Sequence, residues 1–131
     1  MTFEENTLST HDIATTVATY ALEKKAINPV ILFVEPLLAY CSHFVIVTAS
    51  NSRQVRAIAN HVSVRMKADG MMPLSSEGTQ SGKWVLIDFG DVVFHVFDAE
   101  MRGFYDLDGL WTDAERIDVP GHVTREQAVF V

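Results

Sequence analysis

The chain has 131 residues, of which 48% are hydrophobic and 21% are charged, a composition typical of one soluble globular domain. Seventeen acidic against ten basic side chains give a net charge of −7, which argues against a surface that holds nucleic acid mainly by neutralising phosphates. The single cysteine, Cys41, excludes an internal disulfide and a cysteine-based metal motif, in keeping with a reducing compartment.

The N-terminal third is predicted to form a helix and a strand. Ser9 or Thr10 can cap the helix, with Asp12 in a capping-box position. The helix should end at Asn28, because the residue before a proline disfavours the α conformation. An unbroken apolar run then predicts a strand over residues 30–34.

The middle of the chain is predicted to form a strand, a helix and a short strand. Residues 44–47 are an apolar run of strand length, and small polar residues follow them. Apolar side chains then recur at helical spacing and predict the core positions Val55, Ile58, Ala59, Val62 and Met66. Gly70 marks the end of this helix, and a short third strand should lie within residues 71–77.

A β-hairpin is the clearest feature of the sequence. Two apolar runs, 84–89 and 92–97, are separated by Gly90 and Asp91, and glycine tolerates the positive φ that a tight turn requires. Both faces of the second run are apolar, so other elements must cover both sides of this hairpin.

A short helical return is predicted over residues 98–111, followed by a tail, 113–131, that we expect to be partly ordered at best. The alternation of helices and strands predicts a single α/β domain with a mixed five-stranded sheet and helices packed on it. The acidic start lacks the pattern of a secretory signal, and the longest uncharged stretch is too polar to span a membrane. We therefore expect a cytoplasmic protein.

The passage from the second strand to the second helix, residues 48–53, is compatible with two roles. A helix N-terminus with Ser50, Ser52 and Arg53 nearby could bind a phosphate. The passage has no glycine and no phosphate-binding lysine, so simple capping of the helix by Ser50 or Ser52 is the alternative that its residues favour.

Four titratable side chains, three of them in or beside the hairpin, are candidates for a site. Asp88 and Asp91 could hold a metal ion, but nothing near them in the sequence supplies a third ligand. His95 has no nameable nucleophile or partner and is expected to be a hydrogen-bonded structural histidine rather than a general base. Cys41 is expected to be a small buried apolar side chain. We therefore predict no catalytic residue, no metal and no cofactor.

Trp84 opens the hairpin directly after a polar tip, where a large ring could lie at the surface and bind a partner protein. Tryptophan is also commonly buried in cores, and its position alone does not separate the two roles.

Four ordered segments resemble the ribosomal silencing factor family, also called RsfS or Iojap. Residues 40–59 resemble its DYFVIATGxSxRQV segment, and residues 74–78 its PLxxEG motif. Residues 84–97 resemble WxLxDxGDVxVHxF, and residues 102–111 resemble RxFYxLExLW. The resemblance covers roughly residues 10 to 112, with Ala49 where glycine is usual and Asp108 where glutamate is usual.

The resemblance implies a non-enzymatic repressor of translation with a nucleotidyltransferase-like fold. Such a factor binds the fourteenth protein of the large ribosomal subunit and blocks subunit joining when nutrients are scarce. It implies a silencing-factor domain at 9–112, between the flexible lead-in that we expect at 1–8 and the tail at 113–131. The family's interface tryptophan corresponds to Trp84, and the expected neighbours in binding are Leu74, Glu77, Lys83 and Asp88.

Two alternatives stay open. A nucleotide-binding protein or nucleotidyltransferase would use Ser50 or Ser52 with Asp88 and Asp91, although these aspartates lack the alternate spacing of a two-metal pair. A homodimer could form through an apolar strand edge, with or without ribosome binding.

Overall fold

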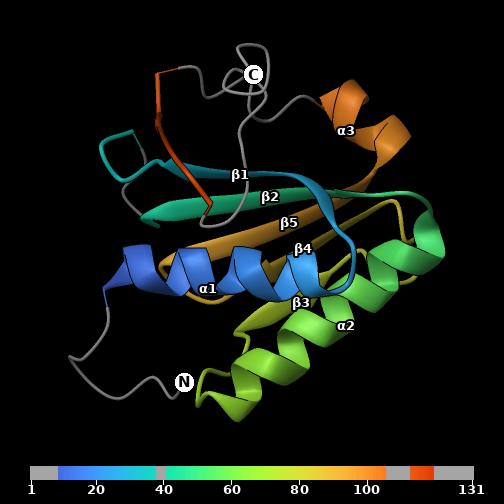
Figure 1. The fold of residues 1–131 in the computed structure, drawn as a ribbon, viewed down its shortest axis with the longest axis horizontal. Coiled ribbons are helices and arrows are strands. Elements are labelled where there is room, and N and C mark those ends of the chain that lie inside the picture. Colours follow the sequence, from blue (N-terminus) through green and yellow to red (C-terminus); the bar gives the residue numbers. More distant parts are fainter. Residues whose placement is uncertain (1–8, 38–40, 106–112, 120–131) are drawn as a thin grey trace.

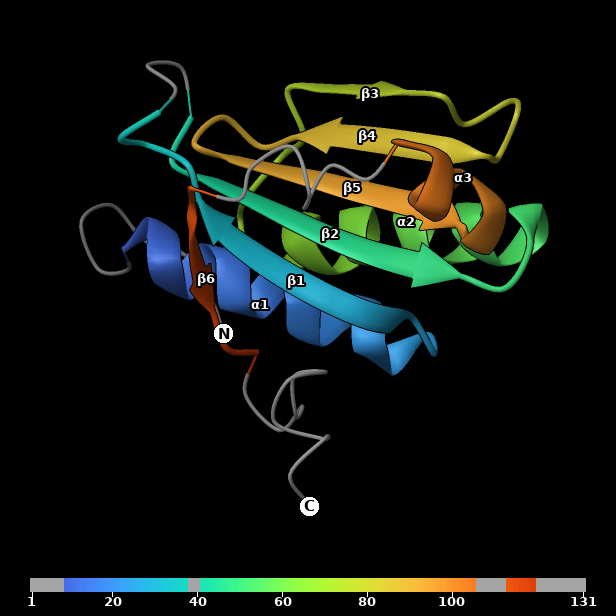
Figure 2. The same ribbon diagram turned by 90° about the horizontal axis from the view of Figure 1, so that it is seen from above.

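The computed structural model describes residues 9–37, 41–105 and 113–119. Six strands form one mixed sheet in the order β3-β4-β5-β2-β1-β6, seen from above in Figure 2. Only β2 and β5 pair in parallel among these neighbours; the other four pairs are antiparallel. The strand bounds are Ile27–Phe33 (β1), His43–Ala49 (β2), Ser75–Glu77 (β3), Trp84–Asp88 (β4), Val92–Asp98 (β5) and Glu115–Ile117 (β6).

The two long helices cover one face of this sheet. The helices are α1 (Thr10–Glu23), α2 (Ser52–Ala68) and α3 (Ala99–Tyr105). Figure 1 shows α1 and α2 on one side of the strands and the short α3 on the other. No helix in the described part of the chain is long and apolar enough to cross a membrane.

The strands send alternate side chains into two separate apolar clusters. The larger cluster lies beneath α1 and α2 and includes Val45, Val47, Phe94 and Val96, all with no exposed surface. The smaller one lies on the opposite face and includes Leu32, Phe44, Ile46 and Phe97. The predicted covering of both sides is confirmed for the second run, Val92 to Phe97, which is buried and contributes to both clusters. It is not confirmed for the first run, because Trp84, Leu86 and Asp88 are only half-buried on the face away from α1 and α2.

The predicted cap of α1, the predicted core positions of α2 and the predicted turn at Gly90 are all confirmed. Ser9 caps α1 in a capping box with Asp12. The five predicted core positions of α2 are its five buried residues. Gly90 has φ +96 in the β4–β5 turn, as the hairpin prediction required.

The end of α1 was predicted too late. The helix stops at Glu23, because Lys25 adopts a left-handed φ of +65 and turns the chain toward the sheet. Asn28 and Pro29 belong to β1 instead, within a stretch whose pairing to β2 shifts register. A proline is compatible with a strand at such an irregularity, where a ladder hydrogen bond is already missing.

The prediction of five strands is also wrong. The tail contains β6, which pairs with β1 in antiparallel orientation. Three residues, none of them buried, give too short a pattern to indicate a strand in the sequence. The third strand forms, but only over Ser75–Glu77. Residues 106–111 of the predicted helical return lie outside the described residues.

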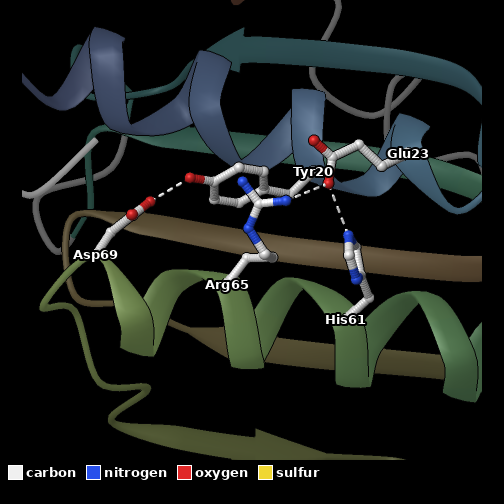
Figure 3. Close-up of polar contacts among 5 residues, drawn as sticks. All are labelled: Tyr20, Glu23, His61, Arg65 and Asp69. Atoms are coloured by element: carbon white, nitrogen blue, oxygen red, sulfur yellow. Dashed lines mark hydrogen bonds and ion pairs between the residues drawn. The ribbon is translucent and has the colours of Figure 1, made fainter.

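Polar side chains join the two long helices above the core (Figure 3). The Tyr20 hydroxyl on α1 donates to the Asp69 carboxylate at the end of α2. The Arg65 guanidinium lies 4.2 Å from the centre of the Tyr20 ring and donates to Glu23 Oε1 at 2.8 Å. His61 Nε2 lies 2.8 Å from the same oxygen. These contacts hold α1 and α2 together on their outer side.

Candidate partner-binding face of the sheet

Trp84 is the first residue of β4, and its side chain lies on the face opposite α1 and α2. Its ring stacks on Phe97 of β5, with the ring centres 4.9 Å apart and the planes 24° from parallel. The indole Nε1–H donates to His95 Nδ1 at 3.2 Å. The ring is only half-buried, so it is fixed in orientation while part of it stays accessible.

His95 is the buried acceptor that orients this ring. Only 4% of His95 is exposed, and burial, together with the charge of Arg102, lowers its pKa to about 4. The imidazole is therefore neutral at neutral pH, with its proton on Nε2, because Nδ1 accepts from Trp84. Nε2 has no hydrogen-bond partner among the described residues. The predicted hydrogen bonding of this histidine is confirmed.

The predicted binding residues lie around β3 and β4. Trp84 and Asp88 share a face of β4, since alternate residues of a strand point the same way. Glu77 of β3 is opposite Leu86, which places it on that face too. Leu86 is half-buried and lies between Trp84 and Asp88 on that face. It was missed, although its alternation with Trp84 was a usable signal.

The remaining predicted residues lie at the two ends of this strand pair. Lys83 is exposed directly before Trp84, and its carbonyl accepts from Asp98 N–H at 2.9 Å. Leu74 is 72% exposed at the other end, where its N–H donates to the Asp88 carbonyl at 2.7 Å. The Asp88 side chain also has a local role, because its Oδ1 accepts from Gly90 N–H at 2.7 Å.

The turn that precedes Trp84 is held by α2. Arg56 donates through Nε to the Thr79 carbonyl at 2.9 Å and through Nη2 to the Gln80 carbonyl at 2.7 Å. Gly78 and Gly82 both have positive φ, +89 and +67. Sequence reasoning missed Arg56, because nothing local indicates that a helix side chain reaches a turn 23 residues later.

The passage into α2 is organised differently from both of its predicted roles. Asn51, not Ser50 or Ser52, caps the helix, and its side chain accepts from Gln54 N–H. The Ser50 N–H donates to Gln54 Oε1 at 2.6 Å, so one amide that a phosphate could use is already bound. Asparagine can cap the helix from this position because its side-chain oxygen reaches the backbone N–H of the third residue after it.

The residues of the nucleotide hypothesis are not brought together. Ser50 follows Ala49, which pairs with Asp98, whereas Asp91 precedes Val92, which pairs with His43. The length of this parallel pair, about 20 Å at the usual rise per residue, separates the two ends. Among the described residues, no group of three or more His, Cys, Asp or Glu side chains could hold a metal ion.

Cys41 lies in the smaller apolar cluster and is 4% exposed, which confirms the prediction of a buried side chain. Burial, with the nearby charges of Asp88 and Asp91, raises the pKa of its thiol to about 11. The nucleophilic thiolate is therefore scarce at neutral pH.

Comparison with known proteins places the chain among ribosomal silencing factors. The family model "Ribosomal silencing factor during starvation" matches residues 7–129. The Ribosomal silencing factor RsfS of Bacillus subtilis is 34% identical over 97 residues, which cover 74% of this chain and 82% of that protein. The RsfS of Chromobacterium violaceum is 43% identical over 75 residues, which cover 57% of this chain and 62% of that protein.

A plant relative and a solved structure are also similar to the chain. The chloroplastic protein Iojap of Zea mays is 34% identical over 116 residues, which cover 86% of this chain and 49% of that protein. A crystal structure of a Chromobacterium violaceum protein superposes with a TM-score of 0.78 at 30% identity, covering 90% of this chain and 98% of that one. With its predicted motifs, its α/β fold and a family match over nearly its whole length, the chain belongs to the ribosomal silencing factor family.

Proposed function

We propose that this protein represses translation by binding the large ribosomal subunit and sterically blocking its association with the small subunit when nutrients are limited. Its partner there is the fourteenth protein of the large subunit. Family membership supports a role on the ribosome. The observation that indicates which surface binds is the half-buried Trp84 ring. Phe97 and His95 fix this ring on the sheet face that α1 and α2 leave uncovered.

A ring held in this way suits an interface anchor. Tryptophan is enriched among the residues that carry most of the binding energy of protein interfaces. Stacking and a hydrogen bond restrict the ring before the partner arrives, so less conformational entropy is lost on binding. The net charge of −7 would speed encounter with a basic ribosomal protein.

The proposed interface runs along β4 and the edge next to it. Trp84 and Leu86 supply apolar contact at its centre, and the exposed Leu74 supplies it at one end. Glu77 and Asp88 present carboxylates to basic side chains, and Asp88 does so with one oxygen bound to the turn. Lys83, at the other end, is the one cation among the proposed contact residues.

Sedimentation with separated ribosomal subunits tests this function. The protein should migrate with large subunits and reduce the amount of joined ribosomes, at one copy per subunit and without turnover. Trp84→Ala should weaken this binding by more than about 1 kcal/mol, as expected for an interface anchor.

Val64→Ala is the matched control, because Val64 is an apolar residue, 54% exposed, on α2 at the other side of the sheet. Equal binding by Trp84→Ala and Val64→Ala would place the interface elsewhere. Failure of the wild type to bind large subunits from its own source would reject the function itself.

Other expectations stay predictions: the absence of enzymatic activity and of a cofactor, the cytoplasmic location, the boundary of the domain at residue 112, the likeness to nucleotidyltransferases and the homodimer. A calorimetric titration with magnesium and nucleotides addresses the enzymatic alternative. A signal that Asp88→Asn removes would favour it over silencing.

A further inference from the structure

We propose that Arg56, on α2, is a positioning residue for partner binding: it fixes the β3–β4 turn and, through that turn, the placement of Lys83 and Trp84. This inference rests on the proposed function, since Trp84 is the anchor whose placement is at issue. Arg56 itself lies on the helix-covered side of the sheet, away from the proposed contact face.

The contact between Arg56 and the turn is a fork. The guanidinium donates to two consecutive carbonyls, Thr79 O at 2.9 Å and Gln80 O at 2.7 Å. A planar guanidinium presents several N–H groups in fixed directions, so two such bonds define the orientation of the turn as well as its distance. Hydrogen bonds from a charged donor are also among the stronger ones.

The turn meets α2 at two places, the fork at Thr79 and Gln80 and the close approach of Gly82 to Ser52. A cavity of about 160 Å³ lies between α2 and β3, and Arg56, Asn60, Ser63 and Ser76 contribute to its lining. Apolar packing across it is incomplete, and Thr79 and Gln80 are exposed. At Thr79 and Gln80 the connection to α2 is therefore made by the Arg56 fork, whereas at Gly82 it is made by packing on Ser52.

The β3–β4 turn also fixes the backbone at Trp84. A Cβ on Gly78 would lie 2.0 Å from the Trp84 carbonyl oxygen, so the two backbones are in direct contact. Gly82, at the other end of the turn, is buried, and a Cβ there would lie 3.0 Å from both Ser52 and Arg56. Its N–H donates to the Gly78 carbonyl at 3.1 Å. A shift of the turn must therefore move the strand start that carries Trp84.

A looser turn should weaken binding without removing any contact to the partner. If only a fraction of molecules holds the ring in place, the apparent dissociation constant rises by the inverse of that fraction. Loss of one net hydrogen bond from the fork sets the upper limit of this effect at roughly three- to tenfold.

A double-mutant cycle on large-subunit binding tests the inference. Arg56→Lys keeps the charge but loses the fork, and we expect it to weaken binding by up to roughly three- to tenfold. Arg53→Lys, the same exchange at an exposed position of the same helix, should bind like the wild type. In the Trp84→Ala background the effect of Arg56→Lys should become clearly smaller, because only the part that acts through Lys83 remains.

An unchanged affinity of Arg56→Lys, or an equal loss in both backgrounds, would overturn the positioning role while leaving the proposed function intact. Backbone amide exchange gives a measurement that does not need the ribosome. Exchange of the Gly82 N–H should be faster in Arg56→Lys than in Arg53→Lys. Equal exchange would overturn the inference even if the wild type failed to bind large subunits, a failure that would reject the proposed function separately.

Discussion

The two faces of the sheet use the same strands for different purposes. Beneath α1 and α2, side chains such as Val47 and Phe94 have no exposed surface. On the opposite face, His95 is buried among aromatic rings, and Trp84 and Leu86 are only half-buried. Side chains alternate along a strand, so one segment can stabilise the fold with one face and present a binding surface with the other.

Adjacent residues of β4 allow the sharpest test of this contrast. Ile87 is 1% exposed on the helix-covered face, and Leu86 is half-buried on the other. Ile87→Ala should lower the free energy of unfolding by about 2–5 kcal/mol, because it removes buried methyl groups and leaves a cavity. Leu86→Ala should cost clearly less stability but should weaken large-subunit binding. Urea unfolding and sedimentation measure the two quantities.

Equal loss of stability in the two variants would break the contrast between the faces. Normal binding by a folded Leu86→Ala variant would remove Leu86 from the interface.

The buried histidine makes one face sensitive to pH. His95 has a pKa of about 4 in the folded chain, below the ordinary value of 6.5, because burial and Arg102 disfavour its charged form. The unfolded chain therefore binds more protons between these values. The contribution of neutral His95 to the free energy of unfolding is complete above pH 6.5 and is lost as the pH falls toward 4. The loss is on the order of 2 kcal/mol between pH 7 and pH 5.

Urea unfolding of the wild type and of His95→Gln at both pH values isolates this contribution. The variant should lose less stability on acidification, since the other titrating groups are common to both chains. His43, whose pKa burial also lowers, is among those common groups. Parallel losses in the two proteins would show that His95 does not carry the pH dependence.

The smallest expected effect concerns the outer side of the helices. Tyr20→Phe removes the hydroxyl that donates to Asp69, which is 7% exposed. The loss of this hydrogen bond should lower the free energy of unfolding by about 1 kcal/mol, measured by urea unfolding. Large-subunit binding should stay unchanged, because the cluster of Figure 3 lies on α1 and α2. Weakened binding would place part of the interface on the helices.

Local patterns in the sequence predicted most of the fold. The core of α2 follows from helical spacing, and the hairpin follows from two apolar runs around Gly90. The capping box at Ser9 also depends on neighbours only three residues apart. These features are determined by interactions that are short in sequence, which is why they can be predicted.

The features that were missed depend on contacts between distant segments. β6 is a strand because β1 offers an open edge, and nothing in residues 115–117 indicates this. Arg56 matters because the fold brings a turn to it. In the candidate site, Trp84 was predicted through a resemblance, but its hydrogen bond to His95 depends on the register of β4 and β5.

The pairing of β1 with β6 bears on how the chain folds during its own synthesis. β1 can pair with β2 early, since the two strands are neighbours in the sequence. Its other edge is not covered until residues 115–117 have been made and have left the ribosomal tunnel. From the time β1 and β2 have paired until β6 emerges, each nascent chain therefore carries an open strand edge that neighbouring nascent chains on a polysome could pair with.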